Sequence, residues 1–155
     1  MKFTNGFWLV RDEFQADYVR DIYEVEEREN ELLAFAPYKQ IQGRGDTLNI
    51  GMMTYSFTAP AKDVLGIRMV NHAGNYVKSP SFELYGNLDK KPESECEKAS
   101  GKEKWTLKSG NLSLEFETGS PEMKFYGNGQ ELTCIKSKTT GMMYHKEGMN
   151  YLVSG

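Results

Sequence analysis

The chain has 155 residues, of which 39% are hydrophobic and 26% charged, and its net charge is −3. This length fits one domain with a single buried core, and the composition excludes a disordered chain. The balance of 19 Lys and Arg against 22 Asp and Glu also excludes a strongly basic nucleic-acid binder.

The first predicted element is a β-hairpin near the N-terminus. Residues 24–33 contain enough Glu and Arg to pass for a helix, but the residues before them are β-branched or aromatic. Asn30 and Glu31 indicate a turn. We therefore expect strands over residues 18–26 and 31–36, with the second strand ending at Pro37, which cannot donate to a ladder.

The next predicted strand covers residues 47–57. Its apolar positions are first Leu48, Ile50 and Met52, and then shift phase to Met53, Tyr55 and Phe57. A β-bulge at residues 52–53 would explain this slip, because a bulge inserts one extra residue into a strand.

Two later segments alternate apolar and polar residues. Leu65, Ile67 and Met69 alternate in the first, and Leu112, Leu114 and Phe116 in the second. Each pattern predicts a half-buried antiparallel strand with one solvated face. Residues 86–104 between them are rich in Lys, Glu and Ser, which indicates a solvated edge strand or a long loop.

The C-terminal third predicts a further hairpin. Asn128-Gly129 separates residues 123–126 from residues 131–135, and this dipeptide favours the type I′ turn of a two-residue hairpin. Residues 150–153 resemble the start of another strand. With 15 Gly dividing the chain into short segments and few helix signals, the sequence predicts an all-β fold, an antiparallel β-sandwich.

Compartment is indicated by the N-terminus and the cysteines. Residues 7–10 are the only apolar run near the start, too short for a secretory signal, and no window is long enough to span a membrane. Cys96 and Cys134 lack CxxC spacing, so we expect two free thiols, at least one of them buried. These features predict a cytoplasmic protein.

The sequence contains no recognisable catalytic or metal-binding motif. His72 and His145 are the only histidines, and neither has a second ligand at metal-binding spacing, so we expect no metal and no cofactor. Glu93, Glu95 and Glu97 would share one face of a strand, as in a cation site. Because several Lys surround them, a solvated edge protected by charge is the simpler interpretation.

Three other patterns have simple structural interpretations. Arg44-Gly45-Asp46 matches the integrin-binding tripeptide, but without an export signal we interpret it as a turn in which Gly45 supplies an unusual φ. Asn111-Leu112-Ser113 matches the N-glycosylation pattern and is interpreted as a turn-to-strand junction. A last set of aromatic residues could form a sugar-binding platform or sandwich core: Tyr76, Tyr85, Trp105 and Tyr126.

A series of short motifs runs through the chain in a fixed order. They are Gly6-Phe7-Trp8-Leu9, Glu24-Val25-Glu26 with Asn30-Glu31, Gly66-Ile67-Arg68-Met69, Lys108-Ser109-Gly110-Asn111-Leu112-Ser113 and Asn128-Gly129. In order and separation this series resembles the N-terminal region of bacterial α-xylosidases of glycoside hydrolase family 31. The resemblance spans nearly the whole chain.

The resemblance implies that residues 1–155 form a single galactose-mutarotase-like β-sandwich domain, incomplete because it is truncated before its last strands and before a (β/α)8 catalytic barrel. In this family two Asp carboxylates on the barrel act as nucleophile and acid/base, the arrangement of a retaining glycosidase. None of the following matches those positions: Asp12, Asp17, Asp21, Asp46, Asp63 and Asp89. The chain itself is therefore expected to be non-catalytic and to hold no catalytic residue.

Two residues match positions that approach a neighbouring subunit's active site in oligomeric members of the family, Trp8 and Asn49. A Trp face stacks on the apolar face of a sugar, and an amide can donate to and accept from hydroxyls. The family pattern carries an acidic residue where this chain has Asn49, which implies a changed aglycone contact. The alternatives are core or interface packing for Trp8, and a solvent-facing strand position for Asn49.

The expected partners follow from the same resemblance. They are the chain's own downstream barrel, further copies of the full-length protein and the carbohydrate substrate of the assembled enzyme, with no nucleic acid and no membrane. An alternative function is a free-standing carbohydrate-binding β-sandwich with an aromatic platform. A third, an adhesion domain using Arg44-Gly45-Asp46, would require secretion.

Overall fold

The computed structural model describes residues 3–5, 9–71 and 90–154. Every pairing between strands in these residues is antiparallel, and the strands form four sheets. The predicted all-β antiparallel fold is therefore confirmed.

A five-stranded sheet forms one layer of a sandwich. Its strands are β8 (Glu93–Ala99), β9 (Lys102–Ser109), β10 (Leu112–Glu117), β11 (Met123–Gly127) and β12 (Gln130–Ile135), in the order β12-β11-β10-β9-β8. Each strand pairs with its neighbour in sequence. The sheet is thus built from local hairpins.

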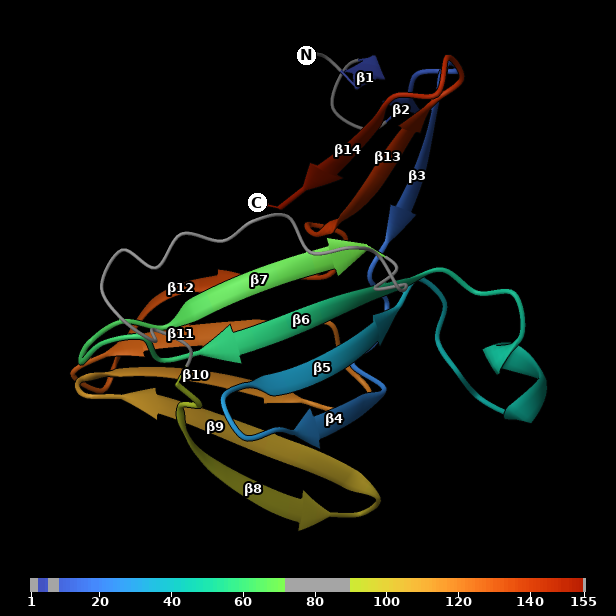
Figure 1. Ribbon diagram of the computed structural model, residues 1–155. Coiled ribbons are helices and arrows are strands. Elements are labelled where there is room, and N and C mark those ends of the chain that lie inside the picture. The colour runs from blue at the N-terminus through green and yellow to red at the C-terminus, as the bar shows by residue number, and fades with distance from the viewer. Residues whose placement is uncertain (1–2, 6–8, 72–89, 155) are drawn as a thin grey trace.

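A four-stranded sheet forms the other layer. Its strands are β4 (Glu24–Glu27), β5 (Leu32–Pro37), β6 (Met52–Thr58) and β7 (Gly66–Asn71), paired in sequence order. One buried cluster contains residues of both sheets, and the rings of Phe57 and Phe116 stack between the layers at 5.4 Å. Figure 1 shows the two layers lying one against the other.

A second, smaller body projects from one end of the sandwich (Figure 1). It is the sheet β14-β13-β3, made of β3 (Phe14–Tyr18), β13 (Gly141–His145) and β14 (Asn150–Val153), together with the short pair β1 (Thr4–Asn5) and β2 (Leu9–Val10). We call these strands the arm. Since β3 pairs with β13, the arm joins the beginning of the chain to its end.

The predicted hairpins are confirmed, with one change of boundary. β4 and β5 pair as expected, and β5 ends at Pro37. The first strand, however, begins only at Glu24: Tyr18 belongs to β3 in the arm, and residues 19–23 belong to no strand. Asn128 and Gly129 have φ of 51° and 78°, as a type I′ turn requires, and they join β11 to β12.

The strand predicted over residues 47–57 is wrong in its first part. β6 begins only at Met52, and it pairs with β5 in continuous register, so no bulge lies at residues 52–53. Residues before it form a short 3-10 helix, η1 (Arg44–Thr47). The apparent shift in phase came from joining a loop to a strand.

The expectation of a solvated edge strand is confirmed for residues 93–99. β8 is the outermost strand of its sheet, and most of its residues are exposed; residues 86–89 lie outside the described part. Residues 150–153 form β14, as predicted. Cys96 and Cys134 are both free, but Cys96 is exposed and Cys134 half-buried, so the prediction of a buried thiol is wrong.

Candidate contact surfaces

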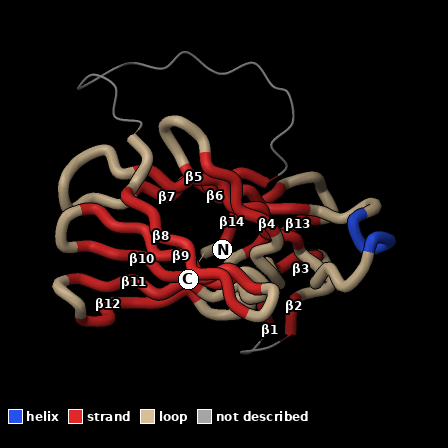
Figure 2. The backbone as a smooth tube through the Cα atoms, turned by 90° about the horizontal axis from the view of Figure 1, so that it is seen from below, coloured by secondary structure: helices blue, strands red, loops and turns tan. Residues whose placement is uncertain are grey.

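The segment between β5 and β6 is a closed loop that carries Asn49. At its base the amide of Tyr38 donates to the carbonyl of Gly51 at 3.1 Å. A Cβ atom at residue 51 would lie 2.7 Å from the Tyr38 ring, so this close approach requires glycine. The helical turn η1 of the loop lies beyond the sheets in Figure 2.

Asp46 organises this loop from within. Its carboxylate accepts hydrogen bonds from the Lys39 ammonium group at 2.5 Å and from the amides of Gln42 and Gly43 at 3.1 Å. The bond from Lys39, followed by that from Gln42, holds the pKa of Asp46 below its usual value. The carboxylate of the Arg44-Gly45-Asp46 tripeptide is thus engaged by its own loop.

Asn49 lies in this loop between η1 and the base at Gly51, and it is exposed to solvent. Its φ is 55°, in the left-handed region, whereas Gly45 is not among the residues with positive φ. The interpretation of Gly45 as the residue with unusual φ is therefore wrong, as is the placement of Asn49 on a strand. Asn tolerates this conformation because its short side chain can bond locally. Leu48 beside it is 74% exposed.

Trp8, the other residue predicted to contact a neighbouring active site, lies outside the described residues. Asn49 is described and is exposed to solvent. The proposed role of both residues in sugar contact stays a prediction.

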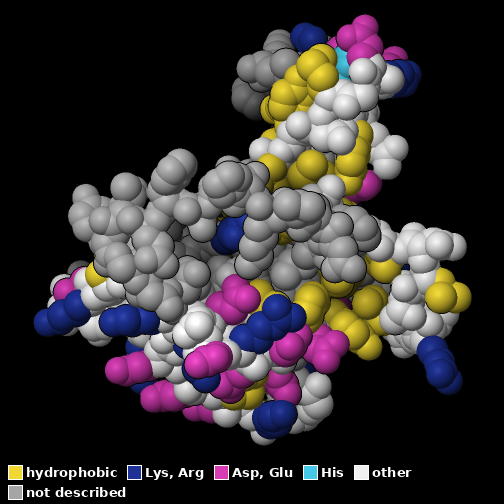
Figure 3. Space-filling model, in the orientation of Figure 1, with side chains coloured by type: hydrophobic (Ala, Val, Ile, Leu, Met, Phe, Trp, Pro, Cys, Tyr) yellow, Lys and Arg dark blue, Asp and Glu magenta, His cyan; other side chains and the backbone are white. Residues whose placement is uncertain are grey.

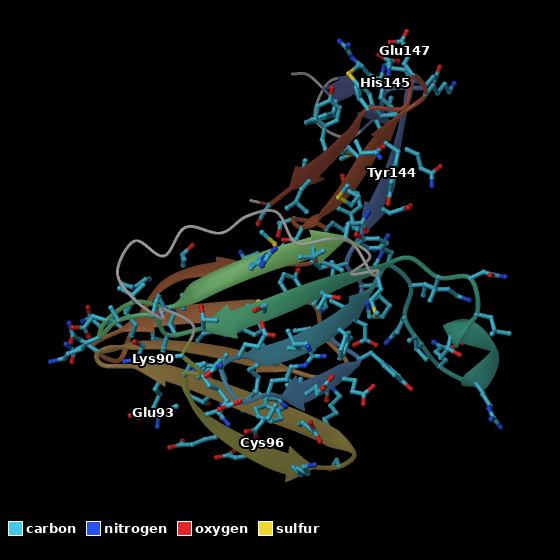
Figure 4. All side chains as sticks on the ribbon, viewed as in Figure 1. Lys90, Glu93, Cys96, Tyr144, His145 and Glu147 are labelled. Atoms are coloured by element: carbon cyan, nitrogen blue, oxygen red, sulfur yellow. The ribbon has the colours of Figure 1, made fainter. Side chains whose placement is uncertain are left out.

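A series of two side-chain hydrogen bonds, which was not predicted from the sequence, connects the sandwich to the arm. The Tyr38 hydroxyl donates to Asn71 Oδ1 at 2.7 Å, and Asn71 Nδ2 donates to the Tyr144 hydroxyl at 3.4 Å. Tyr38 directly follows β5, Asn71 ends β7 and Tyr144 lies on β13, where Figure 4 labels it. No sequence pattern predicts these hydrogen bonds, because the three residues are distant in sequence.

Tyr38 is suited to the donor role in this series. Burial, with smaller effects from Tyr144 and the negative charge of Asp17, raises the pKa of Tyr38 far above its ordinary value. The hydroxyl therefore keeps its proton at neutral pH and can donate to Asn71.

An aromatic cluster forms the interior of the arm. Phe3 makes edge contacts with Phe14 and Tyr151, with ring centroids 5.2 Å and 5.5 Å apart, and Phe14 contacts His145 at 4.9 Å. The Nδ1 atom of His145 accepts a bond from the amide of Glu147 at 3.2 Å. His145 is thus a packed, hydrogen-bonded histidine (Figure 4), while His72 lies outside the described residues.

The arm also exposes large apolar side chains. Leu9 is 68% exposed, Met149 47% and Leu152 46%. Hydrophobic side chains are visible along the arm in Figure 3.

The outer face of the five-stranded sheet is charged. The core residues Trp105, Leu107 and Leu114 point inward, so alternation places Lys104 and Lys108 of β9 on the opposite face. Ion pairs cross the strands there, with Lys108–Glu95 at 2.8 Å, Lys104–Glu115 at 3.2 Å and Lys102–Glu117 at 3.2 Å.

The acidic residues of β8 fit the charged edge that was predicted. By register Glu93, Glu95 and Glu97 face Lys108, Thr106 and Lys104, on the outer face. Among the residues that the structure describes, no group of three or more His, Cys, Asp or Glu could hold a metal ion.

Trp105 cannot belong to the sugar-binding platform considered for the four aromatic residues. This residue is only 5% exposed, it belongs to the core, and its indole nitrogen donates to Glu103 at 3.1 Å. The platform interpretation is therefore wrong for Trp105. Tyr126 is half-buried on β11, and Tyr76 and Tyr85 lie outside the described residues.

Asp21 is the most buried carboxyl group described, with 4% of its surface exposed. Burial raises its pKa, and the amides of Gly119, Ile22 and Ile41 offset this only in part. Oδ1 of Asp21 has no hydrogen-bond partner among the described atoms. The residue lies where loops of both sheets meet, since the Gly119 amide also donates to the Ile22 carbonyl at 3.0 Å.

The structure also bears on the turn at Asn111 and on membrane-spanning helices. Asn111 lies in the turn before β10, where its amide donates to Asp63 Oδ1 at 2.6 Å, so the turn-to-strand interpretation is confirmed. No helix in the described ranges is long and apolar enough to cross a membrane.

Comparison with known proteins gives two relatives that are similar along nearly the whole chain. The α-xylosidase XylQ of Lactiplantibacillus pentosus is 34% identical over 154 residues, which cover 98% of this chain and 19% of the relative. An α-xylosidase of Emericella nidulans is 27% identical over 150 residues, covering 96% of this chain and 18% of the relative. No protein-family model matches the chain.

The chain thus spans about a fifth of the length of the curated relatives it matches. Both relatives carry the same name, and the described residues form an all-β sandwich with a projecting arm. The similarity fits an N-terminal domain of an α-xylosidase.

Proposed function

We propose that this chain is the non-catalytic N-terminal β-sandwich of an α-xylosidase-like retaining glycoside hydrolase. In this proposal residues 1–155 are an incomplete galactose-mutarotase-like domain of a cytoplasmic enzyme of glycoside hydrolase family 31. A (β/α)8 barrel downstream carries the nucleophile and the acid/base. The domain packs on that barrel and contributes to contacts between subunits.

The proposal depends mainly on how much of this chain and how much of each relative the similarity covers. Almost all of this chain, but only about a fifth of each relative, takes part in the similarity. An activity that belongs to the whole relative can therefore depend on residues with no counterpart here.

The surroundings of five of the described carboxylates support a non-catalytic role for those groups. A retaining glycosidase places two carboxyl groups about 5 Å apart, one on either side of the scissile bond. Here Asp46 is held by Lys39 and by loop amides, and Asp21 is buried beneath loops. Glu95, Glu115 and Glu117 pair with lysines on a solvated face.

Within this proposal Trp8 and Asn49 line the aglycone side of a neighbouring subunit's active site. The exposed position of Asn49 in the loop before β6, beside the exposed Leu48, supports such a contact. The amide can exchange hydrogen bonds with sugar hydroxyls, and substitution of Asn49 by Asp would restore the acidic residue of the family pattern.

The test is hydrolysis of p-nitrophenyl α-xyloside. We expect no hydrolysis by purified residues 1–155, and hydrolysis by the longer polypeptide whose reading frame continues past Gly155 into an Asp-bearing barrel. Hydrolysis by residues 1–155 that survives controls for contaminating enzyme would refute the non-catalytic role. A reading frame without a barrel, or an inactive longer polypeptide, would refute the parent activity.

A further inference from the structure

The outer face of the four-stranded sheet has an unusual composition for a sandwich. Along β5 the inward residues Leu32, Ala34 and Ala36 belong to the core, yet Leu33 and Phe35 between them are apolar too. An antiparallel sheet with one solvated face alternates apolar and polar residues. β5 instead has the pattern of a strand that is covered on both faces.

Register places further apolar residues on the same outer face. Phe35 of β5 is opposite Thr54 of β6, and Thr54 is opposite Val70 of β7. Met52 lies one row further along β6. We call Leu33, Phe35, Met52 and Val70 the apolar outer face. None of the four belongs to the core cluster or packs against it.

The apolar outer face is partly accessible to solvent. Phe35, Met52 and Val70 are half-buried, whereas Leu33 is only 6% exposed. Charged residues border it: Glu24 and Glu26 on β4 and Arg68 on β7, all exposed. Figure 3 shows hydrophobic side chains with acidic and basic ones beside them on this side of the molecule.

We propose that the apolar outer face is the surface on which the catalytic domain of the same polypeptide docks. This inference rests on the proposed function and specifies which face of the sandwich meets that domain. The relatives are about five times as long as this chain, so a large body of polypeptide is available to cover an apolar face. The outer face of the five-stranded sheet is occupied by ion pairs and suits water instead.

The chemistry of the partner surface follows from this face. An apolar centre bordered by acidic residues on β4 favours a partner with an apolar patch and a cationic group beside it. Burial of such a patch excludes water from its central residues, and Phe35, the aromatic residue of the set, is the expected centre.

The first experiment measures accessibility with a thiol probe. Phe35→Cys is introduced, and alkylation by iodoacetamide is followed by mass spectrometry in residues 1–155 alone and in the longer polypeptide. The native Cys134, half-buried on the outer face of the five-stranded sheet opposite Lys124, is the internal control. We expect the rate at residue 35 to fall about tenfold or more in the longer polypeptide, and that at Cys134 to change little.

The second experiment uses two matched lysine substitutions. Phe35 is opposite Glu24 and Tyr126 is opposite Glu131, and each aromatic ring is half-buried on an outer face. Phe35→Lys and Tyr126→Lys therefore both place a cation beside a glutamate, and circular dichroism of residues 1–155 checks that both fold. In the longer polypeptide we expect Phe35→Lys alone to speed proteolytic release of the domain, by about tenfold.

The outcomes separate this inference from the proposed function. If the longer polypeptide hydrolyses α-xylosides but residue 35 reacts equally in both proteins, the docking inference is wrong and the proposed function stands. If protection of residue 35 appears in residues 1–155 alone and disappears on dilution, a second copy occupies the face and the inference is also wrong. A longer polypeptide without glycosidase activity contradicts the proposed function, whatever the reactivity of residue 35.

Discussion

The two sheets of the sandwich share one core but differ on their outer faces. The five-stranded sheet presents lysines and glutamates that pair across its strands, and the four-stranded sheet presents Leu33, Phe35, Met52 and Val70. Both inner faces supply fully buried residues such as Leu107 and Tyr55. The inner faces therefore explain why the sandwich folds, and the outer faces distinguish a solvated layer from one suited to a partner.

The difference can be seen in single strands. β10 alternates leucine or phenylalanine with serine or glutamate, which is sufficient for a strand with water on one side. β5 is apolar at every position from Leu32 to Pro37. A continuous apolar strand in an antiparallel sheet is thus a sign of contacts beyond the sandwich itself.

The largest effect that would test this comparison is expected for two neighbouring leucines of β5. Leu32 is fully buried in the core, so Leu32→Ala should lower the free energy of unfolding of residues 1–155 by about 2–5 kcal/mol. Leu33→Ala should cost less, because Leu33, although only 6% exposed, lies outside the core cluster. Urea unfolding followed by circular dichroism measures both, and equal losses would contradict the assignment of two faces.

A smaller effect is expected at Asp21, where loops of the two sheets meet. Its folded-state pKa is raised above 3.8, so the folded state binds its proton more tightly than the unfolded state does. Its contribution to stability should therefore be greatest below pH 3.8 and should fall as pH rises through the raised pKa. Urea midpoints of the wild type and Asp21→Asn over this range should show the wild type losing stability relative to the variant as pH rises. A constant difference between them would exclude this linkage.

The smallest effect is expected on the solvated face. The Lys104–Glu115 pair lies on the solvated face, with side-chain exposures of 51% and 31%, and such pairs contribute little because solvent and salt screen them. Glu115→Gln should leave the unfolding midpoint of residues 1–155 nearly unchanged at moderate salt. A marked loss of stability in Glu115→Gln, with no comparable loss when salt is added to the wild type, would contradict this expectation. It would show that Glu115 stabilises the fold by more than a screened ion pair.

The parts of the fold that the sequence predicts well are local. Asn128-Gly129 fixes the β11–β12 hairpin because few residues accept two successive positive φ values, and the alternation in residues 112–116 fixes β10. Both signals lie within a few neighbouring residues. Neither depends on a distant segment.

The parts that the sequence predicts poorly depend on distant or competing contacts. The loop after β5 looked like a strand, because nothing in its apolar spacing reveals that Asp46 binds Lys39 and the amides of Gln42 and Gly43. Tyr38, Asn71 and Tyr144 form one hydrogen-bonded chain although they are far apart in sequence. Trp105 is of a residue type that often binds sugars, but in this fold it is buried in the core.

The pairing of β3 with β13 has a consequence for how the molecule folds. Residues 14–18 can find residues 141–145 only after the chain between them has become compact, because closing so long a loop costs entropy before any contact offsets it. The local hairpins of the sandwich have no such requirement. The arm should accordingly acquire its structure last, and removing β3 or β13 should abolish it while leaving the sandwich hairpins able to form.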